Sequence, residues 1–131
     1  MSVSQMKGRI LVVDDEPALR DALCEVLESE GYTAIASPQG EHALQTLRSS
    51  APLPDVIILD MLMPGIDGYQ FRKLQKKDPT LASIPVVAAT AVGCVADIDA
   101  DVILHKPFDI DVLLRVVDHF CLGEALPSMQ N

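Results

Sequence analysis

Five short apolar runs, separated by segments with helical periodicity, constrain the fold of this chain more than any other feature of its sequence. The runs have the length of strands, and the segments between them repeat apolar residues three and four positions apart, as amphipathic helices do. Strands that alternate with helices build βαβ units, in which a parallel sheet carries helices on both faces. The pattern therefore predicts an α/β fold with a doubly wound, five-stranded parallel sheet.

The predicted elements follow one another in a regular order. The strands are expected at residues 9–13, 32–36, 56–59, 84–90 and 102–104. One helix is expected to begin at Pro17, which suits a first helical turn, and to be closed by Gly31. The other helices are expected at residues 41–48, 69–77 and 110–120. Because the run 56–59 is apolar at every position, it is typical of a strand buried on both faces.

Length and composition indicate one domain. The 131 residues suffice for a single hydrophobic core, and with 49% hydrophobic but only 4% aromatic residues this core should be aliphatic. We expect an N-terminal segment over residues 1–7, the domain over 8–122 and a flexible tail over 123–131. The sequence is compatible with a complete protein and with a piece of a longer one.

The charge balance narrows the classes of partner. A net charge of -9 makes direct binding to nucleic acid or to an anionic membrane unfavourable, because long-range repulsion opposes the approach. The sequence shows neither an apolar run long enough to span a bilayer nor a signal peptide, so we expect a cytoplasmic protein. The three cysteines, Cys24, Cys94 and Cys121, show no metal spacing, which favours reduced thiols.

Polar residues stand at or just after the ends of four of the five predicted strands. Asp14 and Asp15 follow the first strand, Asp60 the third and Lys106 the fifth, while Thr90 ends the fourth. Parallel sheets of this kind bind ligands at the carboxyl ends of their strands. We therefore expect these five side chains to meet at one edge of the sheet.

The residue types in this set point to phosphoryl chemistry. Three neighbouring carboxylates repel one another and need a cation, and Mg²⁺ takes one or two carboxylates together with water and phosphate oxygens. Thr90 and Lys106 would then bind the remaining oxygens of a phosphoryl group. The set favours attack by a carboxylate on phosphorus, which gives an aspartyl phosphate.

Four motifs in sequence order closely resemble the receiver domain of two-component response regulators. They are "VVDDE", "IILDMLMPGIDGY", "VVAAT" and "HKPF", and the resemblance covers about residues 8–120. Each motif alone would be weak, whereas all four together are specific. The resemblance implies a flavodoxin-like fold with strand order 2-1-3-4-5.

The resemblance also implies a role for each residue of the predicted site. Asp60 would be the phosphoacceptor. Asp15 and Asp60 would bind Mg²⁺ directly, Asp14 would bind it through water, and the backbone carbonyl of Leu62 would add a further ligand. Thr90 and Lys106 would contact the phosphoryl group.

Further implications concern the loops and the partners. Pro107 would be a cis-proline, and Pro64, Asp67 and Gly68 match a loop at the rim of the site. The donor would be a sensor histidine kinase or a histidine phosphotransfer protein. The domain would not be a dedicated enzyme: it would catalyse its own phosphorylation and a slow dephosphorylation. As a monomer or weak dimer, it would signal to a downstream protein target and bind no nucleic acid or membrane.

Simpler interpretations of the same residues stay open at this point. Asp14 and Asp15 could cap a helix and favour its dipole, and Asp60 could bond to a turn. Gly65, Asp67 and Gly68 could be turn formers only. The cations of the predicted helix 69–77 could form a merely solvated face. The three histidines, His42, His105 and His119, are interpreted as surface residues.

The sequence departs from the family at two places that matter for how a partner protein would recognise the phosphorylated domain. Receivers usually carry an aromatic residue in the fifth strand, and Ile103 stands there. The stretch between Thr90 and Lys106 is short for a strand plus a normal helix of about 8 or more residues. We therefore expect a shortened or missing fourth helix, with a loop or a single turn over residues 91–101.

The resemblance also suggests how fast a phosphorylated form would lose its phosphoryl group, and one alternative function stays open. Leu62 and Val92 occupy positions that flank the route of the hydrolytic water, and because both are apolar we predict slow self-dephosphorylation. A haloacid-dehalogenase-like phosphatase would need an acid where Leu62 stands, and "DDEP" is a poor nucleotide loop. The alternative that remains is a receiver-fold scaffold that signals without phosphorylation.

Overall fold

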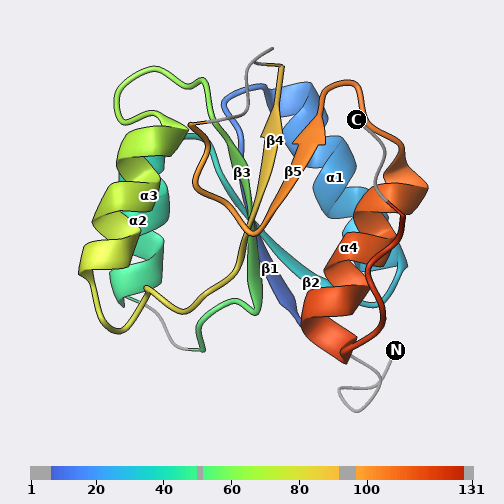
Figure 1. Cartoon of the computed structure of the whole chain (residues 1–131). Helices are drawn as coiled ribbons and strands as arrows, with labels where there is room; N and C mark the ends of the chain where they lie inside the picture. The colour runs from blue at the N-terminus through green and yellow to red at the C-terminus, as the bar shows by residue number, and fades with distance from the viewer. Residues whose placement is uncertain (1–6, 50–51, 92–96, 129–131) are drawn as a thin grey trace.

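The computed structural model describes residues 7–49, 52–91 and 97–128, and the structural statements below concern these residues. Its centre is one parallel five-stranded sheet in the order β2-β1-β3-β4-β5 (Figure 1). The strands are β1 (Arg9–Val13), β2 (Thr33–Ser37), β3 (Val56–Asp60), β4 (Val86–Thr90) and β5 (Val102–His105). The predicted fold class and strand order are confirmed.

Helices cover both faces of the sheet. They are α1 (Pro17–Ser29), α2 (Gly40–Ser49), α3 (Gly68–Lys77) and α4 (Ile110–Leu122). Helices α1 and α4 lie on one face, and α2 and α3 lie on the other (Figure 1). This arrangement is the doubly wound architecture that the alternating pattern predicts.

The core consists of two aliphatic layers, one on each side of the sheet. Alternate residues of a strand point to opposite faces, so Ile10 and Val12 of β1 pack under α1 and α4, while Leu11 and Val13 pack under α2 and α3. All five residues of β3 are buried, as expected for the central strand of such a sheet. The predicted aliphatic core is therefore observed.

Several predicted element bounds were wrong by one or two residues, and backbone bonds explain two of them. Tyr32 does not open β2, because its N–H donates to the Leu27 carbonyl at the end of α1. Ile84 does not open β4, because its N–H donates to the Leu81 carbonyl in a turn. The final helix continues past Phe120 to Leu122 and ends at Gly123, whose φ of 76° is left-handed.

The connection between β4 and β5 contains no helix among its described residues, which are 91 and 97–101. Residues 92–96 lie outside the described part, and the expectations for Val92 and Cys94 lie outside it with them. Four helices are therefore described, and the label α4 belongs to the helix after β5. This agrees with a shortened or missing fourth helix.

None of the four described helices is both long enough and apolar enough to cross a lipid bilayer. The proposed bounds of the domain and of its flexible tail stay predictions.

Candidate functional site

Strand register brings the predicted site residues to one edge of the sheet. Val13 pairs with Leu59, so Asp14 and Asp60 leave neighbouring strands at the same level. Asp60 pairs with Ala89, which places Thr90 one residue beyond it on β4. Thr90 pairs with His105, so Lys106 follows at the adjacent strand end. The expectation that these residues meet at the carboxyl edge is confirmed.

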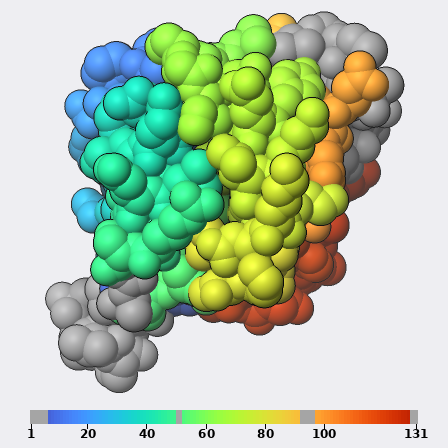
Figure 2. Space-filling view, turned by 90° about the vertical axis from the view of Figure 1, so that its left-hand side faces the viewer, coloured from blue at the N-terminus to red at the C-terminus, as the bar shows by residue number. Residues whose placement is uncertain are grey.

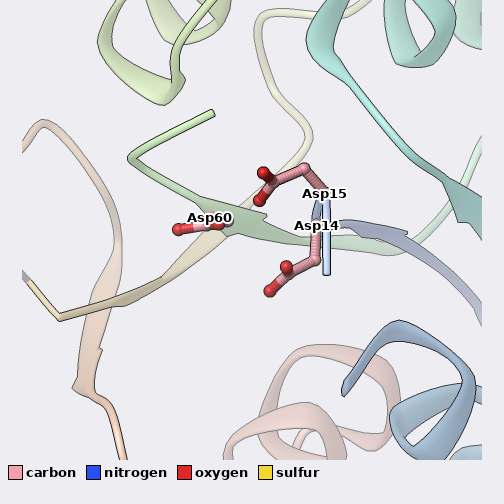
Figure 3. Close-up of side chains that lie close together, drawn as sticks. All are labelled: Asp14, Asp15 and Asp60. Carbon is pink, nitrogen blue, oxygen red and sulfur yellow. The ribbon is translucent and has the colours of Figure 1, made fainter. Parts of the chain in front are cut away.

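Three carboxylates form the centre of this edge. One oxygen from each of Asp14, Asp15 and Asp60 lies within 4.8 Å of the other two. The side chains leave β1 and β3 and point to the same side of the two strand ends (Figure 3). Asp14 and Asp60 are buried, whereas Asp15 is exposed. Asp15 is therefore the acid of the three that is open to solvent.

Lys106 is the cation of the cluster. Its Nζ lies 3.0 Å from Asp14 Oδ2 and 3.6 Å from Asp60 Oδ2. Its backbone N–H donates to the Thr90 carbonyl over 2.8 Å, which extends the pairing of β4 and β5 by one residue. The Lys106–Pro107 peptide bond is cis, as the resemblance implies. Thr90 is completely buried at the end of β4.

The charge at Asp60 is incompletely compensated. Burial and, to a smaller extent, the neighbouring charge of Asp14 raise the pKa of its carboxyl group, which lies at about 6 instead of the ordinary 3.8. Lys106 and the Leu62 N–H, which donates to Asp60 Oδ1 over 3.2 Å, lower this pKa but do not cancel the effect of burial. A group that carries positive charge to the cluster would therefore stabilise the ionised Asp60.

The pKa of Lys106 is also raised, but its cause is the neighbouring carboxylates and not burial. Burial of its ammonium group lowers its pKa, but the hydrogen bond to Asp14 and the charge of Asp60 outweigh burial. The pKa of Lys106 therefore lies above its ordinary value. The lysine is charged at neutral pH and is held against two carboxylates.

Capping of α1 does not explain the paired acids. The N-cap of α1 is Glu16, and no side chain caps this helix end. Instead, Asp14 Oδ1 accepts the Glu16 N–H over 2.9 Å, and Asp14 Oδ2 faces Lys106. Both oxygens of Asp14 are thus in use. For Asp15, the described part of the chain supplies neither a hydrogen bond nor an ion pair to the carboxylate.

The loop after β3 is shaped by Asp67 and Gly68. Asp67 caps α3 by accepting the Gln70 N–H, and the Gln70 side chain accepts the Asp67 N–H in return, which is a capping box. A Cβ atom on Gly68 would lie 2.6 Å from Met61 Cα, so only glycine permits α3 to start so close to the end of β3. Asp67 therefore has a structural role as the N-cap of α3, while its match to the loop at the rim of the site stays a prediction.

The donor set suits a hard divalent cation. Carboxylate oxygens on one side of a strand edge, two of them buried, are the ligands that Mg²⁺ takes in proteins. Three carboxylates face one lysine, so Lys106 alone leaves negative charge to be neutralised. The three acids therefore fit Mg²⁺, while the ligand role of the Leu62 carbonyl stays a prediction.

Comparison with known proteins identifies the family. The model of the response regulator receiver domain matches residues 10–118. The chain belongs to the response regulator receiver domain family. The family match includes all of the strand-end residues described above.

Individual relatives agree with this assignment. The receiver is 39% identical over 109 residues to the phosphate regulon transcriptional regulatory protein PhoB of Klebsiella pneumoniae, a match that covers 79% of this chain and 47% of that protein. The chain thus spans about half the length of this and other curated relatives that it matches.

Two solved structures show the same fold. A signal receiver domain of a histidine kinase from Syntrophus aciditrophicus has a TM-score of 0.80 and 32% identity, with 95% of this chain and 97% of that chain covered. Response regulator TrrA from Thermotoga maritima, solved in complex with Mg²⁺-BeF, has a TM-score of 0.75 and 34% identity, with 86% and 97% covered.

Sequence reasoning missed a buried polar cluster beneath α3. The interpretation of the α3 cations as a solvated face is wrong for Arg72, which is 8% exposed. Its Nε donates to the Asp99 carbonyl over 2.9 Å, and its Nη1 donates to Gln75 Oε1 over 2.9 Å. Its Nη2 lies 3.7 Å from Asp101 Oδ2. No local pattern marks these partners, because Asp99 and Asp101 come from the short β4–β5 connection.

Proposed function

We propose that this receiver accepts a phosphoryl group on Asp60 in a Mg²⁺-dependent reaction, and that the phosphorylated form changes its contacts with a downstream protein. The observation that carries the proposal is the cluster of Asp14, Asp15 and Asp60, with Lys106 held against two of the three carboxylates. The proposed donor is the phosphohistidine of a sensor histidine kinase or of a histidine phosphotransfer protein. The fold gives a carboxylate nucleophile a fixed position beside cationic groups.

In the proposed reaction, a carboxylate oxygen of Asp60 attacks the donor phosphorus. A P–O bond forms, the P–N bond to the donor histidine breaks, and its electron pair stays on the imidazole. Lys106, whose Nζ already lies 3.6 Å from Asp60 Oδ2, would pair with one phosphoryl oxygen. The hydroxyl group of Thr90 would donate a hydrogen bond to another phosphoryl oxygen. When bound, Mg²⁺ would neutralise charge on the acids and on the phosphoryl group.

The role proposed for Asp14 and for Asp15 in binding Mg²⁺ depends on the hydrogen bonds and ion pairs that each carboxylate already makes. Asp15, exposed and without a protein partner among the described residues, suits direct ligation of Mg²⁺. Asp14 has both oxygens engaged, by Glu16 and by Lys106, and so suits contact through a water molecule. The complex of TrrA with Mg²⁺-BeF supports the same class of ligand here.

The surface beside the site suits the binding of a protein that donates the phosphoryl group. An apolar cavity of about 340 Å³ adjoins Lys106 and is lined by Leu19, Lys106, Pro107, Phe108 and Ile110. Leu62, next to the acceptor, is 57% exposed. Apolar side chains around a charged centre give a partner protein area to bury while its histidine reaches Asp60.

The test is incubation with Mg²⁺ and acetyl phosphate, followed by intact mass measurement. We expect a gain of one phosphoryl group that is absent from Asp60→Asn and from samples treated with a chelator. Asp55→Asn, which removes an acid at the opposite end of β3, is the matched control and should be phosphorylated normally. If neither acetyl phosphate nor beryllofluoride modifies or binds the protein, the alternative of a phosphorylation-independent scaffold replaces the proposal.

The predicted slow dephosphorylation has a test of its own. Leu62 has no polar group with which to orient a hydrolytic water beside Asp60. We expect the phosphorylated form of Leu62→Asn to decay faster than the phosphorylated wild type, as followed by intact mass over time. An unchanged half-life would contradict a role for Leu62 in protecting the phosphoaspartate.

A further inference from the structure

The outer side of α3 carries a groove that the proposed phosphoryl chemistry does not use. It has a volume of about 360 Å³ and is lined by Ile66, Gln70, Lys73, Leu74 and Lys77. Figure 2 shows the face of the molecule to which it belongs, formed by α2 and α3. The groove therefore lies on the face opposite to α1 and α4.

The cations of α3 divide into two pairs. Arg72 and Lys76 point towards the β4–β5 connection, where Lys76 Nζ lies 2.6 Å from Asp99 Oδ2 and Arg72 contacts Asp99 and Asp101. Lys73 and Lys77 are exposed and form no ion pair with the described residues. The second pair is thus left with its full charge at the groove.

The lining of the groove combines this charge with apolar surface. Lys73 and Lys77 are four residues apart in sequence, which places them on successive turns of one helix face. Ile66 and Leu74 are partly buried hydrophobic residues that pack against the core beneath α2 and α3. The result is an apolar floor flanked by the two lysines, while the Glu41 carboxylate accepts the Ile66 N–H over 3.4 Å.

The local charge of the groove selects the occupant. At a net charge of -9, a positive pair that binds no acid among the described residues is a local exception on an acidic molecule. A second copy of this chain would bring its own net charge of -9, so its overall repulsion would exceed that of a short acidic segment with few charges. The carboxylates of such a segment would meet opposite charge at Lys73 and Lys77.

We propose that this groove is a docking surface for an acidic segment of a partner protein, with an apolar side chain flanked by carboxylates. The apolar side chain contacts Ile66 and Leu74, and the carboxylates pair with Lys73 and Lys77. Recognition by charge gives the surface its preference for acidic partners, and the apolar floor adds contact area. Because both lysines are free without phosphorylation, the proposal stands apart from the chemistry of Asp60.

The experiment is an amide NMR titration of the ¹⁵N-labelled chain with two synthetic probes. One is an acetylated, amidated peptide Glu-Glu-Leu-Glu-Glu, and the other replaces its leucine by serine. We expect shifts centred on Ile66, Lys73, Leu74 and Lys77, weaker binding of the serine peptide, and weaker binding at higher salt concentration. A peptide of this size is expected to bind in the millimolar range, which the method detects.

Charge reversals locate the site. Lys73→Glu and Lys77→Glu should each weaken binding of the leucine peptide by about two- to fivefold, and the double variant should abolish it. Arg115→Glu changes net charge equally but lies on α4, so it should leave binding nearly unchanged. The proposal is overturned if the shifts map to another surface, if Arg115→Glu acts like Lys73→Glu, or if no shifts appear at millimolar peptide.

Discussion

The carboxyl edge of the sheet and the cluster beneath α3 both bury charged groups, but they compensate the charge differently. At the edge, two buried carboxylates share Lys106, and the pKa of Asp60 rises to about 6. Beneath α3, Arg72 binds a carbonyl, an amide and two carboxylates. Gln75 completes this cluster by donating to the Leu81 and Ile84 carbonyls.

The difference separates the proposed phosphorylation site from a cluster with a structural role. In the described part of the chain, no buried side-chain nitrogen or oxygen lacks a hydrogen-bond partner, so hydrogen bonding alone does not distinguish the two regions. Charge does distinguish them, because three carboxylates and one lysine at the edge leave negative charge that a bound metal ion would neutralise. The Arg72 cluster is closed by protein groups alone and fixes the β4–β5 connection to α3.

The largest expected effect concerns the closed cluster. Gln75→Ala should lower the free energy of unfolding by about 3–5 kcal/mol, because it opens a cavity and leaves the Arg72 guanidinium and two carbonyls without their partner. Urea unfolding measures this loss. Gln45→Ala on the exposed side of α2 is the control and should change stability by no more than about 0.5 kcal/mol. Equal effects of the two variants would contradict a structural role for the cluster.

The second prediction concerns Asp60 at the carboxyl edge of the sheet, where a substitution should raise the free energy of unfolding instead of lowering it. A carboxyl group whose pKa rises from 3.8 to about 6 destabilises the folded protein at neutral pH, by up to about 3 kcal/mol. Asp60→Asn removes this charge and should therefore raise the free energy of unfolding by up to that amount when Mg²⁺ is absent.

The pH dependence of this gain follows from the sign of the shift. Protonation of Asp60 favours the folded state, so its contribution is complete below pH 3.8 and is lost as pH rises to about 6. The advantage of Asp60→Asn should thus be largest above about pH 6 and fall to about half near pH 5. Urea unfolding at several pH values tests this, and an advantage that does not vary with pH would show that charge is not its cause.

The third prediction concerns the binding of Mg²⁺ to the carboxylates at the carboxyl edge of the sheet. Because the ion competes with the proton on Asp60, its affinity should fall by about tenfold from neutral pH to about pH 5, which is about 1.4 kcal/mol. Calorimetric titration at several pH values measures this change. Asp60→Asn should bind Mg²⁺ more weakly and with little dependence on pH over this range. A wild-type affinity that stays constant would remove Asp60 from the set of ligands.

The smallest expected effect lies between the two regions, at the start of α3. Asp67→Ala removes the capping box and should cost about 1 kcal/mol of stability, with the rate of phosphorylation by acetyl phosphate unchanged. Asp109→Ala, at the N-cap of α4, should cost a similar amount. A large loss of phosphorylation in Asp67→Ala alone would make Asp67 part of the functional edge.

The positions of the site residues could be predicted because local pattern and topology place them. Apolar runs mark the strands, and parallel pairing brings the residues after β1, β3 and β5, and Thr90 at the end of β4, to one edge. Individual bounds failed at Tyr32 and Ile84, because apolar residues beside a strand look like strand residues even when a turn takes their backbone N–H.

The sequence by itself determined the α/β layers and the acidic edge with Lys106, since both follow from short-range periodicity and a general rule of parallel sheets. The strand order was predicted from the resemblance to receiver domains. Only the tertiary structure decided which α3 cations are buried and how far the pKa of Asp60 rises. Both depend on groups distant in sequence: Asp99 and Asp101 reach Arg72 across the β4–β5 connection, and Asp14 and Lys106 reach Asp60 from other strands. Burial and charge compensation are properties of that assembled neighbourhood, which no local pattern encodes.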